Sequence, residues 1–163
     1  MKGYHATLKE NGISIIEKRV INLTCGDNSI YGTGNGMYNT TAGYVYLATT
    51  VEKAFDFGLR AWGNRYIQNN NLEKEIYLFE VELTNQEEIL ADEDEAELEG
   101  VDMKQSKEDI IRETQSYRVP KELRFNKEIY RYAVIKFINL KQGYENIDAG
   151  RFNQLVKWNK LLL

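Results

Sequence analysis

The sequence contains very little of the two residues on which most metal and redox sites depend. Its 163 residues include a single cysteine, Cys25, and a single histidine, His5. One cysteine excludes a disulfide within the chain and every metal site that needs two thiolates, and one histidine leaves no zinc cage. The sequence has no run of 18 apolar residues, and its first residues lack the apolar stretch of a secretory signal. We therefore expect a soluble, cytoplasmic protein that binds neither a metal ion nor a membrane.

Negative charge is concentrated in one segment. The formal net charge is −4, yet residues 87–102 hold nine carboxylates and no basic residue. Such a block is typical of a solvated loop or helix face. The lysines and arginines of the C-terminal third are scattered among carboxylates, so the sequence shows no clustered basic patch for nucleic acid. A chain of this length is expected to form one domain, which would cover residues 1–163.

The apolar pattern predicts both strands and helices. Segments rich in Tyr, Phe, Val and Ile predict strands at residues 3–7, 44–48, 75–83, 116–119 and 128–140. Apolar residues at helical spacing predict helices at residues 8–18, 50–68, 107–112 and 151–162. The strands are not regularly separated by helices, which argues against a parallel sheet of βαβ units. We therefore expect an α+β fold with mostly antiparallel strands.

Glycine is concentrated in residues 26–43, which follow neither a helical nor a strand pattern. Composition alone indicates an irregular loop, but a loop of this length in a compact domain is often functional. The segment contains no GxxxxGK[ST] phosphate loop, and its GTGNG does not open a helix after a strand as a dinucleotide fingerprint does. It is therefore a candidate ligand-binding loop without a recognised nucleotide motif.

Two short motifs occur in an order that points to one family. His5 opens the motif His-Ala-Thr at residues 5–7 of the first expected strand; alone, such a histidine is most often a core or edge residue. After the expected helix and the glycine-rich loop comes Tyr-Leu-Ala at residues 46–48, and Phe57 follows the tyrosine by eleven residues. This order and spacing resemble the ADP-ribosyltransferase superfamily, in particular its His-Tyr-Glu branch, which includes diphtheria toxin and the poly(ADP-ribose) polymerases. The sequence departs from that branch at Ala6, where the branch has glycine, and at Phe57, where it has a second tyrosine.

The resemblance implies a fold and a reaction. The fold would be split antiparallel β-sheets with flanking helices and a cleft for NAD, which serves as co-substrate. The activity would be transfer of ADP-ribose from NAD to a macromolecular acceptor, and the resemblance leaves open whether that acceptor is protein or nucleic acid. The residues implied to bind NAD are His5, Ala6, Thr7, Gly34, Gly36, Tyr46, Ala48 and Phe57, and those implied to act in catalysis are His5, Tyr46 and Glu113.

The chemistry of NAD cleavage explains why a family would use these residue types. Breaking the nicotinamide–ribose bond passes through an oxocarbenium-like ribose, as glycoside cleavage does. The rings of Tyr46 and Phe57 would sandwich the nicotinamide and contribute about 0.5–1.5 kcal/mol beyond the burial of their area. His5, beside the hydroxyl of Thr7, would hydrogen-bond the other ribose.

The third motif of the family is a carboxylate near the start of a late strand, where it stabilises the cationic transition state. Glu113, shortly before the expected strand at residues 116–119, fits the family pattern best. Gln115 is a competing position, where the side chain would keep the hydrogen bond but lose the charge. The alternative function is therefore a module of the same fold that binds an NAD-like ligand, or a partner protein, without turnover.

Overall fold

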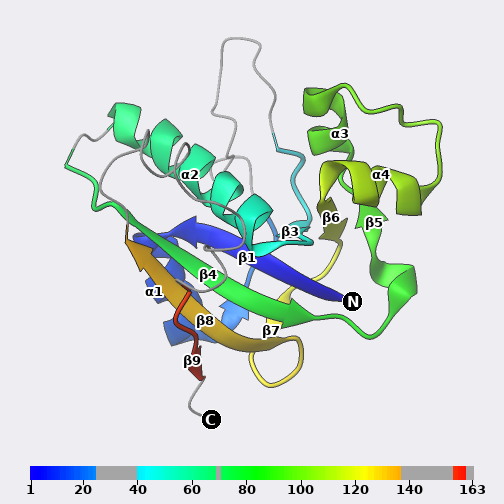
Figure 1. Cartoon of the computed structure of the whole chain (residues 1–163). Coiled ribbons are helices and arrows are strands. Elements are labelled where there is room, and N and C mark those ends of the chain that lie inside the picture. The colour runs from blue at the N-terminus through cyan, green and yellow to red at the C-terminus, as the bar shows by residue number, and fades with distance from the viewer. Residues whose placement is uncertain (25–39, 69–70, 137–155, 161–163) are drawn as a thin grey trace.

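The computed structural model describes residues 1–24, 40–68, 71–136 and 156–160 (Figure 1). The elements within these residues are, in chain order, β1 (Lys2–Leu8), α1 (Lys9–Lys18), β2 (Val20–Ile21), β3 (Val45–Ala48), α2 (Val51–Gln68), β4 (Glu75–Glu82), the 3₁₀ helix η2 (Gln86–Glu88), β5 (Leu90–Ala91), α3 (Glu93–Glu99), α4 (Lys107–Thr114), β6 (Ser116–Val119), β7 (Leu123–Arg124), β8 (Ile129–Lys136) and β9 (Asn159–Lys160).

Seven of these strands form one sheet in the order β5-β6-β3-β1-β4-β8-β9, and β2 pairs with β7 in a separate sheet of two strands. Every strand pairing in the larger sheet is antiparallel. The expected α+β class with antiparallel strands is therefore confirmed.

The larger sheet is nearly divided between β1 and β3. On one side, β1 pairs with β4 along its full length, from Lys2 to Leu8. On the other side, β1 pairs with β3 at one position, Tyr4↔Ala48. In contrast, β3 pairs with β6 at all four of its residues. The sheet thus consists of two parts, β5-β6-β3 and β1-β4-β8-β9, which meet at a single residue pair.

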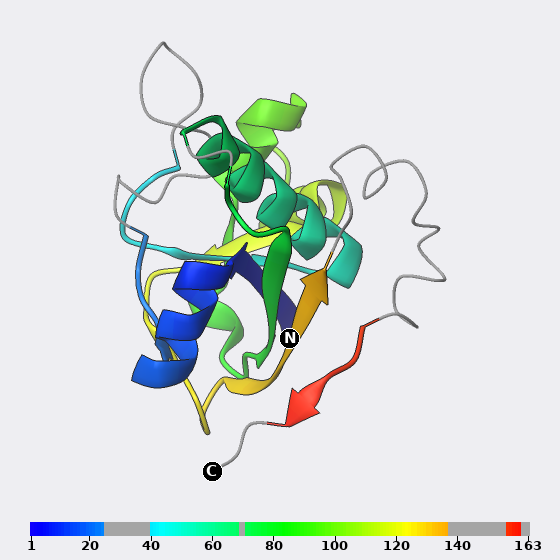
Figure 2. The ribbon, with the colours of Figure 1, turned by 90° about the vertical axis from the view of Figure 1, so that its left-hand side faces the viewer.

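Helices α1 and α2 cover opposite faces of this sheet (Figure 2). Gly58 of α2 lies over Ala6 and Ile76, whereas Gly12 of α1 lies against Tyr77. Neighbouring residues of a strand point to opposite faces, so Ile76 and Tyr77 of β4 place the two helices on opposite sides. Each face has its own hydrophobic core.

Two expectations need correction, and one falls outside the described residues. The expected closing helix is wrong where it is described, because Asn159–Lys160 forms strand β9 beside β8. The acidic segment at residues 87–102 is only partly a solvated face, because it contains β5 and α3 and its Glu95 is fully buried. Most of the glycine-rich segment, including Gly34 and Gly36, lies outside the described residues.

Candidate functional site

His5 lies at the point where β1 separates from β3. Its Nδ1 is 3.0 Å from the backbone carbonyl oxygen of Tyr46. Because a carbonyl can only accept, Nδ1 carries the proton and donates it, which leaves Nε2 of the neutral ring as an acceptor. Burial lowers the pKa of His5 from its ordinary value of 6.5, and the hydrogen bond to the carbonyl partly opposes this shift. The imidazole is therefore neutral at pH 7 and has one acceptor nitrogen.

The side chains of His5 and Tyr46 lie on opposite faces of the sheet. Ala48, two residues after Tyr46, packs in the core on the α2 face, so alternation along β3 places the Tyr46 ring on that face. Gly3, two residues before His5, lies against Tyr117 in the core on the α1 face, so His5 is on the α1 face. The structure thus brings the His5 ring to the backbone of Tyr46, but the two rings point away from each other. The expected convergence of the His5 and Tyr46 side chains on one face of the sheet is therefore not found.

The hydroxyl of Tyr46 contacts the acidic segment. It lies 2.5 Å from Oδ2 of Asp94 and 2.8 Å from the carbonyl oxygen of Thr41, so its single proton is shared between two acceptors. Burial raises the pKa of Tyr46, the Asp94 carboxylate raises it further, and Arg118 opposes the shift. The phenol therefore stays protonated at neutral pH and acts as a donor to Asp94.

Phe57 shares the α2 face with Tyr46, but its ring is covered. The residue is 7% exposed. Lys53 Nζ lies 5.2 Å from the ring centroid, and Arg60 Cζ lies 5.4 Å from it. Cations at this distance from an aromatic face are attracted by the electron density of the ring. Phe57 is thus packed against two cations in this arrangement.

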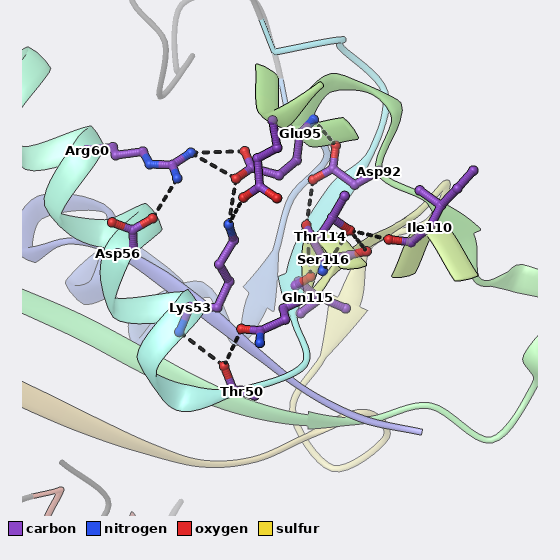
Figure 3. Close-up of polar contacts among 12 residues, drawn as sticks. Thr50, Lys53, Asp56, Arg60, Asp92, Glu95, Ile110, Thr114, Gln115 and Ser116 are labelled. Atoms are coloured by element: carbon purple, nitrogen blue, oxygen red, sulfur yellow. Dashed lines mark hydrogen bonds and ion pairs between the residues drawn. The ribbon is translucent and has the colours of Figure 1, made fainter. Parts of the chain in front are cut away.

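The same two cations bind the buried carboxylate of Glu95 on α3 (Figure 3). Lys53 Nζ is 2.6 Å from Oε1, and Arg60 Nη1 is 3.1 Å from Oε1 and 2.9 Å from Oε2. Lys53 also pairs with Glu99, and Arg60 pairs with Asp56 at 2.6 Å. The Glu95 side chain is 0% exposed, so the charge is tolerated because two cations surround it. This cluster joins α3 to α2.

A second buried carboxylate joins α3 to the sheet. Asp92 is the N-cap of α3, where its Oδ1 accepts from the backbone N–H of Glu95 at 3.0 Å. Its Oδ2 accepts from the hydroxyl of Ser116, the first residue of β6, at 2.5 Å. Burial raises the pKa of Asp92, and these two hydrogen bonds oppose the shift. Helix α3 is therefore anchored at two independent points.

The two candidates for the third motif occupy different places. Glu113 is exposed on α4, in the turn before its end. Gln115 ends that helix with a positive φ of 54° and directly precedes β6. Its carbonyl accepts from the backbone N–H of Thr49 at 2.9 Å. Its side-chain oxygen lies 3.4 Å from the hydroxyl of Thr50 (Figure 3). The structure therefore places Gln115, rather than Glu113, beside the junction of β3 and α2.

The remaining candidate residues have structural contacts. Thr7 is 7% exposed, and its hydroxyl accepts from the Asn11 side chain at 3.3 Å. Ala6 lies beneath Gly58 of α2. Ala48 is 0% exposed. Ala6 and Thr7 thus pack within β1, and Ala48 packs within β3, on the two sides of the split.

The roles of Asp92 and Glu95 in holding α3 were not predicted from the sequence. An Asp followed three residues later by Glu is a recognised signature of a helix start, so Asp92 and Glu95 could have indicated α3. Arg118, whose guanidinium lies 4.2 Å from the centroid of the Tyr44 ring, had no comparable signal in its neighbours along the chain.

Neither a grouped metal site nor a membrane-crossing helix is found among the described residues. Within the described residues, no three His, Cys, Asp or Glu side chains are grouped so that they could hold a metal ion. None of the helices described is both long and apolar enough to cross a bilayer. No model of a known protein family matches the sequence, and no curated protein matches it.

Proposed function

We propose that the chain binds NAD where β1 separates from β3 and transfers ADP-ribose to a macromolecular acceptor, as the ADP-ribosyltransferases that it resembles do. The observation that carries this proposal is the position of His5, at the single junction between the two parts of the sheet. From this junction β3 leads directly into α2, which carries Phe57. A split antiparallel sheet is also what the resemblance implies for an NAD cleft. Because His5 and Tyr46 face opposite sides of the sheet, NAD has to pass through the split between β1 and β3 to reach both side chains.

The neutral imidazole of His5 supports a role in holding a ribose. The hydrogen bond from Nδ1 to the Tyr46 carbonyl fixes the tautomer, so Nε2 can accept a hydrogen bond from a ribose hydroxyl. Such a contact is similar in the ground state and the transition state. Loss of this contact should therefore raise the apparent KM for NAD more than it lowers the turnover rate.

Stacking of the nicotinamide requires a change around α3. The Tyr46 hydroxyl is bonded to Asp94, and the cations that cover Phe57 are bonded to Glu95. Both acidic residues belong to α3, but the two cations lie on α2 together with Phe57. NAD binding is therefore expected to be coupled to rearrangement of the Asp94, Lys53 and Arg60 side chains, while Asp92 keeps α3 bonded to Ser116.

The test is nicotinamide release from NAD by the purified chain, followed by incubation of labelled NAD with cell extract. We expect nicotinamide to be released and a labelled product to form, which either protease or nuclease destroys and thereby identifies the acceptor. His5→Ala should raise the apparent KM for NAD. Tyr130→Phe, at an exposed position of β8, a strand that does not pair with β1 or β3, is the control and should leave this constant unchanged. A chain that neither binds NAD nor releases nicotinamide contradicts the proposal.

Binding without turnover is the second candidate function, and the position of Gln115 favours it. This uncharged side chain, not a carboxylate, stands at the start of β6 beside Thr50. An amide can hold a ribose hydroxyl but contributes no negative charge to an oxocarbenium-like transition state. If NAD raises the melting temperature while no nicotinamide is released, the binding module is the correct function.

A further inference from the structure

Four donor groups converge on the carboxylate of Asp94. The backbone N–H of Thr41 donates to Oδ2 at 2.8 Å, and the Thr41 hydroxyl donates to Oδ1 at 2.7 Å. The Tyr46 hydroxyl lies 2.5 Å from Oδ2, and Arg118 Nη1 lies 3.7 Å from the same oxygen. A backbone N–H, two hydroxyls and a guanidinium are donors with which proteins bind phosphoryl oxygens.

The guanidinium of Arg118 has donor capacity that Asp94 does not use. Its side chain is 7% exposed, and its Nε and Nη1 are buried without a hydrogen-bond partner among the described residues. Its Nη2 lies 3.2 Å from Glu93, whose side chain is 67% exposed. Buried donors without partners are costly, and arginine is suited to binding two oxygens of one anion at once. Compared with a carboxylate, a phosphoryl group offers a third oxygen and up to one more negative charge.

Asp94 is not needed to hold α3 in place. The helix is anchored by Asp92, which is 1% exposed, and by Glu95, which is 0% exposed. The Asp94 side chain is not fully buried, at 13% exposed, and its partner Thr41 is exposed. The Asp94 side chain can therefore rotate out of the donor set while the two buried anchors remain.

We infer that Thr41, Tyr46 and Arg118 form a binding site for a phosphoryl group, which the Asp94 carboxylate occupies as an internal substitute. The site opens to solvent at Thr41. It does not depend on NAD cleavage, because any ligand that carries a phosphoryl group could use it. Since Asp94 is tethered, it competes at a high effective concentration. The ligand must therefore displace the carboxylate, and free phosphate binds weakly to the native chain.

Two variants of α3 test the site. Asp94→Ala removes the internal carboxylate. Glu97→Ala removes the same charge from an exposed position on the same helix. Each variant is titrated with inorganic phosphate and with pyrophosphate at constant ionic strength, and binding is followed by calorimetry and by the amide resonance of Thr41. We expect phosphate to bind Asp94→Ala at least tenfold more tightly than Glu97→Ala, and to shift the Thr41 resonance. Equal affinities for the two variants mean a general charge effect and overturn the inference.

A second substitution tests whether Arg118 holds the anion. Arg118→Lys in the Asp94→Ala background keeps the positive charge but loses the planar pair of donors. This substitution should remove most of the tenfold gain in phosphate affinity. An undiminished gain overturns the assignment of Arg118 to the site. If Asp94→Ala does not fold, Asp94→Asn keeps the side-chain shape. That variant should bind phosphate at least threefold more tightly than Glu97→Gln, and a smaller difference counts against the site.

The source of the phosphoryl group is identified by two further ligands. Asp94→Ala is titrated with adenosine diphosphate and with a short single-stranded oligonucleotide. If adenosine diphosphate binds more tightly than inorganic phosphate, the natural ligand is a small nucleotide. If the oligonucleotide does so, the site holds a nucleic-acid backbone. Both results support the inferred site, and because neither involves nicotinamide release they are independent of the proposed transferase activity.

Discussion

The hydroxyl of Ser116 donates to Oδ2 of Asp92 and thereby joins the first residue of β6 to the residue that caps α3. Both residues are buried, at 0% and 1% exposed. The bond connects the sheet to the helix that carries Asp94 and Glu95. The position of α3 on the sheet therefore depends on a serine 24 residues away along the chain.

Ser116→Ala should lower the free energy of unfolding by about 1–3 kcal/mol, because it leaves a buried carboxylate oxygen without its donor. Urea unfolding followed by circular dichroism measures the change. Asp92→Asn provides the control background, since asparagine still caps the helix but carries no charge. In that background Ser116→Ala should lower the free energy of unfolding by less. An equal decrease in both backgrounds argues that loss of the Ser116–Asp92 bond is not the cause.

Two glycines of α2 should respond oppositely to the same substitution. A Cβ at Gly58 would lie 2.6 Å from Ile76 Cγ2 and 3.2 Å from Ala6 Cβ, whereas a Cβ at Gly63 would meet no atom of the described residues within 4 Å. Alanine is favoured over glycine inside a helix by about 1 kcal/mol. Gly63→Ala should therefore raise the melting temperature, while Gly58→Ala should lower it because the helix is pushed from the sheet. A stabilising Gly58→Ala would show that α2 does not pack closely on β1 and β4.

His5 should make stability depend on pH below its ordinary pKa of 6.5. Burial lowers its pKa below the ordinary 6.5. The unfolded chain therefore binds the proton first as the pH falls, and the free energy of unfolding decreases as the pH drops through 6.5. His5→Asn keeps a donor for the Tyr46 carbonyl but cannot titrate, so its stability should change less over this range. Carboxyl groups with raised pKa, such as Asp92, act in the opposite sense and cancel in the comparison. Parallel curves for the two proteins would show that His5 titrates normally.

The third-motif carboxylate can be identified from turnover. If Glu113 stabilises the transition state, Glu113→Gln should reduce the rate of nicotinamide release by roughly 10²–10³-fold, with a far smaller effect on NAD binding. The structure makes Gln115 the matched comparison, because it lies two residues further along, beside Thr50. An active Glu113→Gln together with an inactive Gln115→Ala would assign the role to Gln115. If neither substitution matters while NAD still binds, the chain is a binding module.

Much of the sheet could be predicted from the sequence, because its long strands carry clear apolar patterns. The expected strands at residues 44–48, 75–83 and 116–119 match β3, β4 and β6 closely, and the helix at residues 50–68 matches α2. The strands β2, β5 and β7 are only two residues long, which is too short for an alternating pattern. The alternation of apolar and polar residues cannot show how many residues of β1 pair with β3. The split of the sheet between these two strands was therefore implied by the resemblance alone.

The environment of the candidate site was less predictable, because charged side chains are normally assigned to the surface. Glu95 is buried only because Lys53 and Arg60, 42 and 35 residues away along the chain, meet it in space. Asp94 likewise meets donors that are distant along the chain, because Thr41 and Tyr46 come from the segment before α2. Composition identified the acidic segment but not its partners.

The full-length pairing of β1 with β4 affects how the chain folds. Lys2 is paired with Glu82 and Leu8 with Ile76, so the central strand of the sheet finds its longest partner about 70–80 residues later. During synthesis β1 must stay unpaired on that side until β4 has left the ribosome. Closing so large a loop before any of these bonds can form is entropically costly, and we therefore expect folding to be slow for a chain of this size. Over that interval the nascent chain exposes the unpaired edge of β1, which leaves its backbone N–H and C=O groups open to pairing with other extended segments.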